Sequence, residues 1–161
     1  MSHLSELLSD QHNQNVEELK ELLRIPSISS LSEHKEDIQK AASWIANKLK
    51  NIGMENVEIV QTKGHPIIYG DWLHQENAPT VLVYAHYDAQ PVDPIDLWET
   101  PPFEPDIRDE KIFARGATDD KGQTFLHIKA VESLLKEENK LPVNLKFCIE
   151  GEEEIGSPRL P

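Results

Sequence analysis

An uninterrupted apolar run in residues 80–85 constrains the fold of this chain more than any other feature. The run reads Thr-Val-Leu-Val-Tyr-Ala, so both faces of an extended strand would be apolar. A short run of this kind is typical of a strand that other elements cover on each side. We therefore expect residues 80–85 to form a central strand within a layered domain.

The spacing of apolar residues elsewhere predicts helices and further strands. Helical spacing predicts helices in residues 16–23, 38–52 and 119–139, the second with Gly53 at its C-terminal cap. Extended spacing predicts strands in residues 57–61, 67–72, 111–114 and 143–149. The order of strand, helix and strand in the second half favours the α/β class: a layered domain with a central mixed, largely parallel sheet flanked by helices.

Residues 90–105 form a connection that is rich in proline and acidic residues. A connection of this length inside a compact domain is either disordered or an ordered functional loop. Because Trp98 and Phe103 lie within it, we expect an ordered loop.

The chain is strongly acidic, and its length allows one domain with a hydrophobic core. Its 161 residues include 16 Lys and Arg against 29 Asp and Glu, which gives a formal net charge of −13 at pH 7. An acidic surface repels phosphate backbones, so we expect no nucleic-acid partner. No apolar stretch approaches the ~20 residues that span a bilayer, and no secretory signal is visible. With the single Cys148, which cannot form an internal disulfide, these features predict a cytoplasmic protein without a membrane partner.

Polar clusters follow two of the predicted strands and open the helix between them. His86 and Asp88 come directly after the first strand, and the acidic run 150–154 comes directly after the second. Asp119 opens the helix. In α/β domains the functional residues gather beyond the carboxyl ends of the strands, so these clusters could converge on one edge of the sheet.

Each cluster alone has an ordinary structural explanation. His86 could lie on a solvated surface, and the acidic run 150–154 could lie in a solvated loop. Asp119 could stabilise the positive end of the helix dipole, with Thr118 as the N-cap. Gly122 is less ordinary, because glycine costs about 1 kcal/mol in a helix interior, and it suggests a close approach of the backbone.

Taken together, the clusters supply the ligands of a catalytic metal site. Histidine, aspartate and glutamate provide the nitrogen and oxygen atoms that bind catalytic zinc or manganese. Asp88 shares a strand face with His86 and could hold the second ring nitrogen of that histidine. Glu153 and Glu154 would point in opposing directions on an extended chain, so one could bind metal while the other holds a water.

These residues fall in four segments that resemble the co-catalytic zinc peptidases. The segments are HYDAQP at residues 86–91, DLWETPPFEP at 96–105, ARGATDDKG at 114–122 and EGEEEIGS at 150–157. That family includes carnosinase-like dipeptidases, aminoacylase, succinyl-diaminopimelate desuccinylase and carboxypeptidase G. The proline-rich segment is most similar to the cytosolic non-specific dipeptidase branch.

The resemblance implies a role for five residues. His86 would bind one of two divalent metal ions, Asp119 would bridge both, and Glu154 would bind the other. Glu153 would be the general base that activates water, and Asp88 would orient His86. The expected metal is Zn²⁺, with Mn²⁺ or Co²⁺ as alternatives.

The resemblance also implies how the chain is organised. Residues 1–161 would form a partial metallopeptidase catalytic domain, with N-terminal helices in 1–53 and the sheet and metal-ligand region in 54–161. The family pattern needs a further acidic ligand, a late histidine and an inserted lid or dimerisation domain, and none of these follows Glu154. We therefore expect an inactive, truncated fragment of a protein whose full-length form could be a homodimer.

The function implied by the resemblance is metal-dependent hydrolysis of dipeptides, with small peptides as substrates. One alternative is an N-acyl amino acid amidohydrolase of the same family, which would use the same metals with a different pocket. The other alternative is a non-catalytic metal-binding or interaction fragment.

Overall fold

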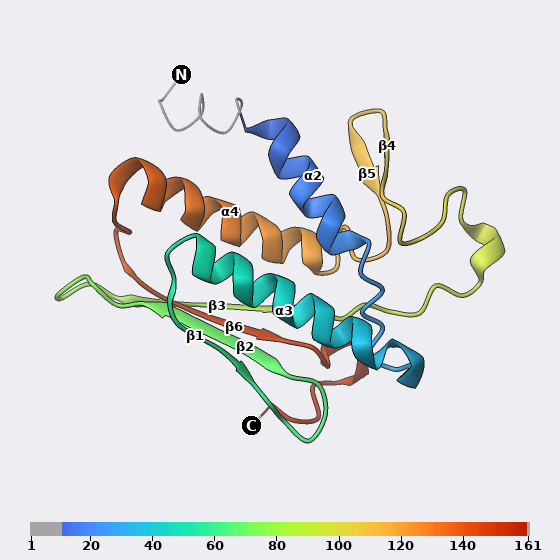
Figure 1. Cartoon of the computed structure of the whole chain (residues 1–161), viewed down its shortest axis with the longest axis horizontal. Helices are drawn as coiled ribbons and strands as arrows, with labels where there is room; N and C mark the ends of the chain where they lie inside the picture. Colours follow the sequence, from blue (N-terminus) through green and yellow to red (C-terminus); the bar gives the residue numbers. More distant parts are fainter. Residues whose placement is uncertain (1–10, 161) are drawn as a thin grey trace.

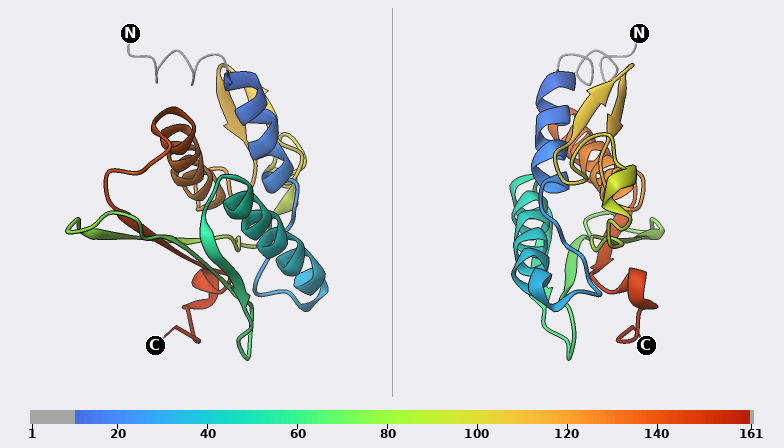
Figure 2. Two further views of the ribbon diagram at one scale, coloured as in Figure 1. Left: turned by 60° about the vertical axis from the view of Figure 1, so that its left-hand side comes forward. Right: turned by 90° about the vertical axis from the view of Figure 1, so that its right-hand side faces the viewer.

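The computed structural model describes residues 11–160 as a four-stranded sheet with helices packed on one face. Figure 1 shows the helices side by side above the sheet, and the turned view in Figure 2 shows them on the same side of it. The helices are α2 (His12–Leu23), α3 (Lys35–Asn51) and α4 (Lys121–Glu138). The strands are β1 (Glu55–Val60), β2 (Ile67–Trp72), β3 (Thr80–His86), β4 (Asp106–Arg108), β5 (Lys111–Phe113) and β6 (Asn144–Glu150).

The sheet has the order β1-β2-β6-β3 and mixes both kinds of pairing. β1 and β2 are antiparallel, as are β2 and β6, whereas β3 and β6 run parallel. The helix α4 forms the crossover between the parallel strands β3 and β6. The predicted strand in residues 111–114 does not join this sheet, because Lys111–Phe113 pair with β4 in a separate hairpin. The α/β class and the mixed sheet are confirmed, and within residues 11–160 the parallel character belongs to the β3–β6 pair.

The helices bury apolar stripes against the sheet, where α3 packs on β1 and β2 and α4 packs on β3. The buried core residues of α3 are Ile38, Ala41, Ala42, Ile45, Ala46 and Leu49, and those of β6 are Leu145, Phe147 and Ile149. Gly53 follows the C-cap of α3 at φ +95°, a conformation that glycine adopts without a steric penalty, and this confirms the predicted cap. None of the helices in residues 11–160 is long and apolar enough to cross a membrane.

Within residues 11–160, the expectation that residues 80–85 form a central strand is not met. β3 is an edge strand, since β6 is its one partner in the described sheet. Val81, Leu82 and Tyr84 are 43%, 61% and 49% exposed, and burial begins at the carboxyl end, with Ala85. Apolar residues on both faces indicate that a strand can be buried on both sides. They do not indicate which elements lie against it or which strands pair with it.

The segment 90–105 is ordered, as predicted. Trp98 donates its indole N–H to the carbonyl of Val92 at 3.0 Å, and the guanidinium of Arg115 lies 5.3 Å from the Trp98 ring centroid. Arg115 also donates a side-chain hydrogen bond to the carbonyl of Pro91 and a backbone one to Pro102, both at 2.8 Å. These contacts hold the loop against the hairpin β4–β5, which pairs separately from the main sheet.

A group of charged side chains joins the three helices where they pack together. Glu132 of α4 contacts Lys129 and Lys136 of the same helix, and its Oε2 lies 3.5 Å from Lys48 of α3. Glu18 of α2 accepts from Lys48 at 2.7 Å and from Lys129 at 3.1 Å. Burial opposes the charge on Glu132, but the three lysines outweigh it and lower the pKa of Glu132 to about 2.

We predict that Glu132→Gln destabilises the chain in a manner that depends on pH. The folded pKa lies below the unfolded value of 4.5, so the contribution of the carboxylate is complete above pH 4.5 and disappears as the pH falls towards 2. The variant should therefore lose about 1–3 kcal/mol of unfolding free energy at pH 7, and this difference should shrink in acid. Urea unfolding between pH 2.5 and 7 measures it. The control is Glu138→Gln, an exposed position in the same helix; an equal loss in both variants would contradict the prediction.

We also predict that Leu82→Lys lowers self-association of the chain. An edge strand with exposed apolar residues and no charged side chain in residues 80–85 can pair with a strand of another molecule, and a lysine there suppresses such pairing. The opposite edge of the sheet differs, because β1 carries Glu55 and Glu58 and an irregular register between them. Sedimentation velocity over a concentration series measures the effect, with Ile95→Lys in the exposed loop as the control. A wild-type chain that stays monomeric throughout would show the prediction to be wrong.

Candidate functional site

The two parallel strands end at the same edge of the sheet and bring their polar residues together there. His86, the last residue of β3, pairs in register with Glu150, the last residue of β6. The side chain of His86 is 8% exposed, so its ring is fixed by its surroundings. The predicted convergence of the clusters on one edge of the sheet is therefore confirmed.

The imidazole of His86 lies among three carboxylates. Its Nδ1 is 3.3 Å from Oδ1 of Asp88, and its Nε2 is 3.1 Å from Oδ1 of Asp119 and 3.8 Å from Oε2 of Glu153. Burial alone would lower the pKa of His86, but Asp88 and then the charges of Asp120 and Glu153 outweigh it and raise this pKa to about 9. The surroundings therefore favour a positive charge at the ring, which a proton or a cation could supply.

Asp88 connects the histidine to the turn that carries the glutamates. Its side chain is completely buried, and its two carboxylate oxygens accept the backbone N–H groups of Glu153 at 3.2 Å and Glu154 at 3.1 Å. Burial disfavours its charge, but His86 and the backbone N–H of Glu154 outweigh burial and lower the pKa of Asp88. Asp88 is therefore a fixed anion between the ring and the turn.

Glu153 and Glu154 both reach the histidine, so the expectation that they point in opposing directions was wrong. β6 ends at Glu150, and the chain then forms a short 3₁₀ turn, η3 (Glu153–Ile155), instead of continuing as a strand. One donor atom each from His86, Glu153 and Glu154 lies within 4.8 Å of the others. Partial burial and the neighbouring carboxylates of Glu154, Asp88 and Asp119 raise the pKa of Glu153 against the opposing effect of His86.

Residues at the N-terminus of α4 form hydrogen bonds with the backbone of His86. Asp120 accepts the backbone N–H of His86 at 3.1 Å, and the hydroxyl of Thr124 donates to the carbonyl of His86 at 3.2 Å. The helix begins at Lys121 with Asp120 in the N-cap position, so the predictions of a start at Asp119 and an N-cap at Thr118 were wrong. The carboxylate of Asp120 is bound to His86 rather than capping the helix, and this leaves Asp119, whose side chain is 70% exposed, facing the ring.

Sequence reasoning assigned no role to several residues that build this site. Lys121 is completely buried and donates to the carbonyls of Leu22 at 3.3 Å and Ile25 at 2.5 Å, which ties the start of α4 to the end of α2. Burial lowers the pKa of Lys121 to about 7. Gln90 donates to Oε2 of Glu154 at 2.7 Å. Asp120, Lys121 and Gln90 lie close in sequence to the predicted ligands, and this proximity was the one feature of the sequence that could have indicated their roles.

The donor set at this edge of the sheet fits a divalent cation. All five site residues named from the sequence meet here: His86, Asp88, Asp119, Glu153 and Glu154. The carboxylates outnumber the one imidazole, so the group is negatively charged whether or not the ring carries a proton, and these nitrogen and oxygen atoms are those that zinc and manganese prefer. The centre is open to solvent on the Asp119 side.

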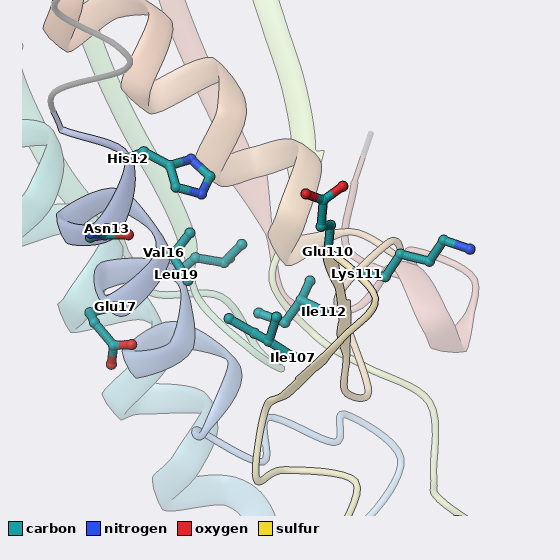
Figure 3. A pocket seen from close by; sticks show the side chains of 9 residues that line it. All are labelled: His12, Asn13, Val16, Glu17, Leu19, Ile107, Glu110, Lys111 and Ile112. Atoms are coloured by element: carbon teal, nitrogen blue, oxygen red, sulfur yellow. The ribbon is translucent and has the colours of Figure 1, made fainter.

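A separate hollow lies away from this centre, between α2 and the hairpin β4–β5 (Figure 3). Its volume is about 620 Å³, and its apolar lining comes from Val16 and Leu19 of the helix and Ile107 and Ile112 of the hairpin. It shares no residue with the His86 cluster. The candidate metal-binding residues therefore lie at the edge of the sheet and not in this hollow.

We predict that Gly122→Ala destabilises the chain, although alanine normally favours a helix by about 1 kcal/mol over glycine. A Cβ atom at Gly122 would lie 2.0 Å from the carbonyl oxygen of Ala117, which confirms the close backbone approach expected from the sequence. The turn before α4 would have to shift, at a cost of about 1–3 kcal/mol. Thermal unfolding measures this, with His127→Ala on the exposed face of α4 as the control. A stabilised Gly122→Ala variant would rule out the clash.

Comparison with known proteins gives consistent matches. The pattern of the peptidase family M20/M25/M40 matches residues 82–160. A cysteinylglycine-S-conjugate dipeptidase of Corynebacterium striatum is 34% identical over 140 residues, which are 87% of this chain and 30% of that protein. A Cys-Gly metallodipeptidase of Candida albicans is 33% identical over 156 residues, which are 88% of this chain and 32% of that protein.

The fold matches as well. The crystal structure of human carnosine dipeptidase 1 superposes with a TM-score of 0.90 at 32% identity, over 98% of this chain and 36% of that one. The chain spans about a third of the length of the curated relatives it matches, and it corresponds to their N-terminal part. Residues 82–160, which contain the segments that form the His86 cluster, therefore match the peptidase family M20/M25/M40.

Proposed function

We propose that this chain supplies part of the metal centre of a dipeptidase, an enzyme that hydrolyses dipeptides with the help of divalent metal ions. The observation that carries the proposal is the close group formed by His86, Glu153 and Glu154, with Asp119 at Nε2 of the same histidine. The two curated relatives described above are both named as dipeptidases, and one of them as a metallodipeptidase. The similarity supports the same substrate class for the protein that contains this segment.

The residues that would hold the metal are His86, Asp119 and Glu154. His86 and Asp119 are in direct contact, so one cation could be shared by both, and Glu154 lies close enough to serve a second. Zinc is the metal we propose, with manganese or cobalt as alternatives. Divalent cations in such a centre lower the pKa of a bound water and polarise the carbonyl group of the scissile bond.

Glu153 would act as the general base. It lies beside His86 with a side chain that is 43% exposed, so it can reach both the centre and an incoming substrate. A carboxylate in this position takes a proton from the attacking water and returns it to the leaving amine. Asp88 would act through His86, because its contact with Nδ1 leaves Nε2 as the nitrogen that faces the cation.

A second candidate function uses the same centre. Hydrolysis of N-acyl amino acids needs the same metals and the same base but a different pocket for the acyl group. The names of the relatives favour dipeptides over acylated amino acids. The family pattern also implies two more metal ligands than residues 11–160 bring together, so we expect little or no catalysis by this chain alone.

We predict that the chain binds Zn²⁺ through His86 and does not need Glu153 to do so. His86→Ala and Asp119→Ala should each lower the Zn²⁺ affinity at least tenfold, because they remove ligand atoms, whereas Glu153→Gln should change it less than threefold. Isothermal titration calorimetry at neutral pH measures all three variants.

The catalytic part of the proposal is tested by dipeptide hydrolysis with added Zn²⁺ or Mn²⁺. The isolated chain should show no turnover that depends on Glu153. In a longer protein that contains this segment, Glu153→Gln should abolish turnover while the metal stays bound. Equal Zn²⁺ affinities of the wild type and His86→Ala would remove the basis of the proposal.

A further inference from the structure

Glu150 is a buried acid that the proposed chemistry does not use. It is the last residue of β6 and is 2% exposed. Its Oε1 accepts hydrogen bonds from the hydroxyl of Tyr84 on β3 and from the hydroxyl of Ser157, the latter at 2.7 Å. Two hydroxyl donors from different parts of the chain therefore meet on one buried oxygen.

Glu150 and Ser157 stand at the two ends of the turn that carries the candidate base and ligand. Within the turn, the backbone N–H of Gly156 donates to the carbonyl of Glu153 at 2.8 Å, and that of Ser157 donates to Glu152 at 2.9 Å. Gly156 and Ser157 have φ angles of +86° and +48°, and the chain reverses there. The hydrogen bond from Ser157 to Glu150 therefore closes a loop around Glu153 and Glu154.

The remaining contacts fasten the turn from other sides. Asp88 accepts the N–H groups of Glu153 and Glu154 from inside, and Arg159 donates to the buried Glu152 at 2.9 Å from outside. Asp88 follows β3 in the chain, whereas the bond from Tyr84 to Glu150 connects the base of the turn to a side chain within that strand.

Glu150 is oriented for this bonding role rather than for binding metal. The close group of candidate ligand atoms in residues 11–160 contains His86, Glu153 and Glu154, and it does not include Glu150. A carboxylate oxygen accepts hydrogen bonds, so the hydroxyls of Tyr84 and Ser157 are the donors in both bonds.

We propose that Tyr84, Glu150 and Ser157 form a clasp that positions the turn so that the carboxylates of Glu153 and Glu154 face His86. The three are positioning residues, which act through the turn and do not touch the reacting atoms. The inference deepens the proposed function and rests on it for the roles of Glu153 and Glu154. The hydrogen bonds themselves do not depend on it.

The first measurement needs no metal. Amide hydrogen exchange, followed residue by residue by NMR, reports how often the N–H groups of Glu153 and Glu154 leave Asp88. Tyr84→Phe and Ser157→Ala each remove one hydroxyl, and the double variant should speed exchange at these two amides about tenfold. The matched control is Tyr69→Phe, which removes a 2.7 Å hydroxyl–carboxylate bond to Asp71 on β2, outside the turn.

Two substitutions of Glu150 distinguish whether its hydrogen bonds or its negative charge hold the turn. Glu150→Gln keeps an oxygen that can accept both hydroxyls, so exchange at Glu153 and Glu154 should stay near the wild-type rate. Glu150→Leu removes the acceptor and should match the double variant. If Glu150→Gln loosens the turn as much as Glu150→Leu does, the negative charge rather than the hydrogen-bonded clasp holds the turn, and the proposal is overturned.

The second measurement is the Zn²⁺ affinity of the same variants, with Zn²⁺ alone as the probe. The double variant should bind Zn²⁺ about tenfold more weakly than the wild type, and Tyr69→Phe should not differ from it. Faster exchange with unchanged Zn²⁺ affinity would show that the clasp stabilises the turn without positioning its carboxylates, which overturns the proposal.

The two proposals fail in different ways. A wild-type chain without Zn²⁺ binding contradicts the proposed function, and the exchange rates then decide whether the clasp exists. Equal exchange rates in the wild type and the double variant overturn the clasp, whatever the Zn²⁺ affinity of the chain.

Discussion

The parallel pairing of β3 with β6 is the interaction on which the rest of this structure depends. Its last pair places His86 opposite Glu150, so the polar segments that follow the two strands begin side by side. Because parallel strands need a crossover, the chain between them must leave and return, and α4 provides that return path. The start of α4 then comes to the same edge and adds Asp119 and Asp120 to the group.

The acidic residues at this edge have distinct tasks despite their similar chemistry. Asp88 and Asp120 are bound to backbone N–H groups, Glu150 to hydroxyls and Glu152 to an arginine, so each is neutralised or satisfied within the protein. Asp119, Glu153 and Glu154 keep their carboxylates toward His86. The first group builds the frame, because a buried carboxylate is stable where several donors meet it. In the function proposed above, the second group would serve the cation and the substrate.

Features of the fold that depend on residues close together in the chain could be predicted from the sequence. The helical stripe of α3, the cap at Gly53 and the close approach at Gly122 all depend on residues near one another in the chain, and the structure confirms them. The central placement of residues 80–85 failed because the neighbours of a strand come from distant segments. The opposing directions of Glu153 and Glu154 failed because β6 ends before them in a turn.

The types of side chain at the site could be predicted from the amino-acid sequence, whereas the contacts between them could not. The amino-acid sequence by itself determined which residues could bind a cation, because imidazole and carboxylate groups follow the apolar strands at recognisable positions. Only the tertiary structure decided that Asp120 holds the backbone of His86, that Lys121 fastens α4 to α2, and that Glu150 faces Tyr84 and Ser157. The reason is that a carboxylate or an ammonium group acts on whatever lies within about 3 Å of it, and those neighbours are set by packing between segments far apart in the chain.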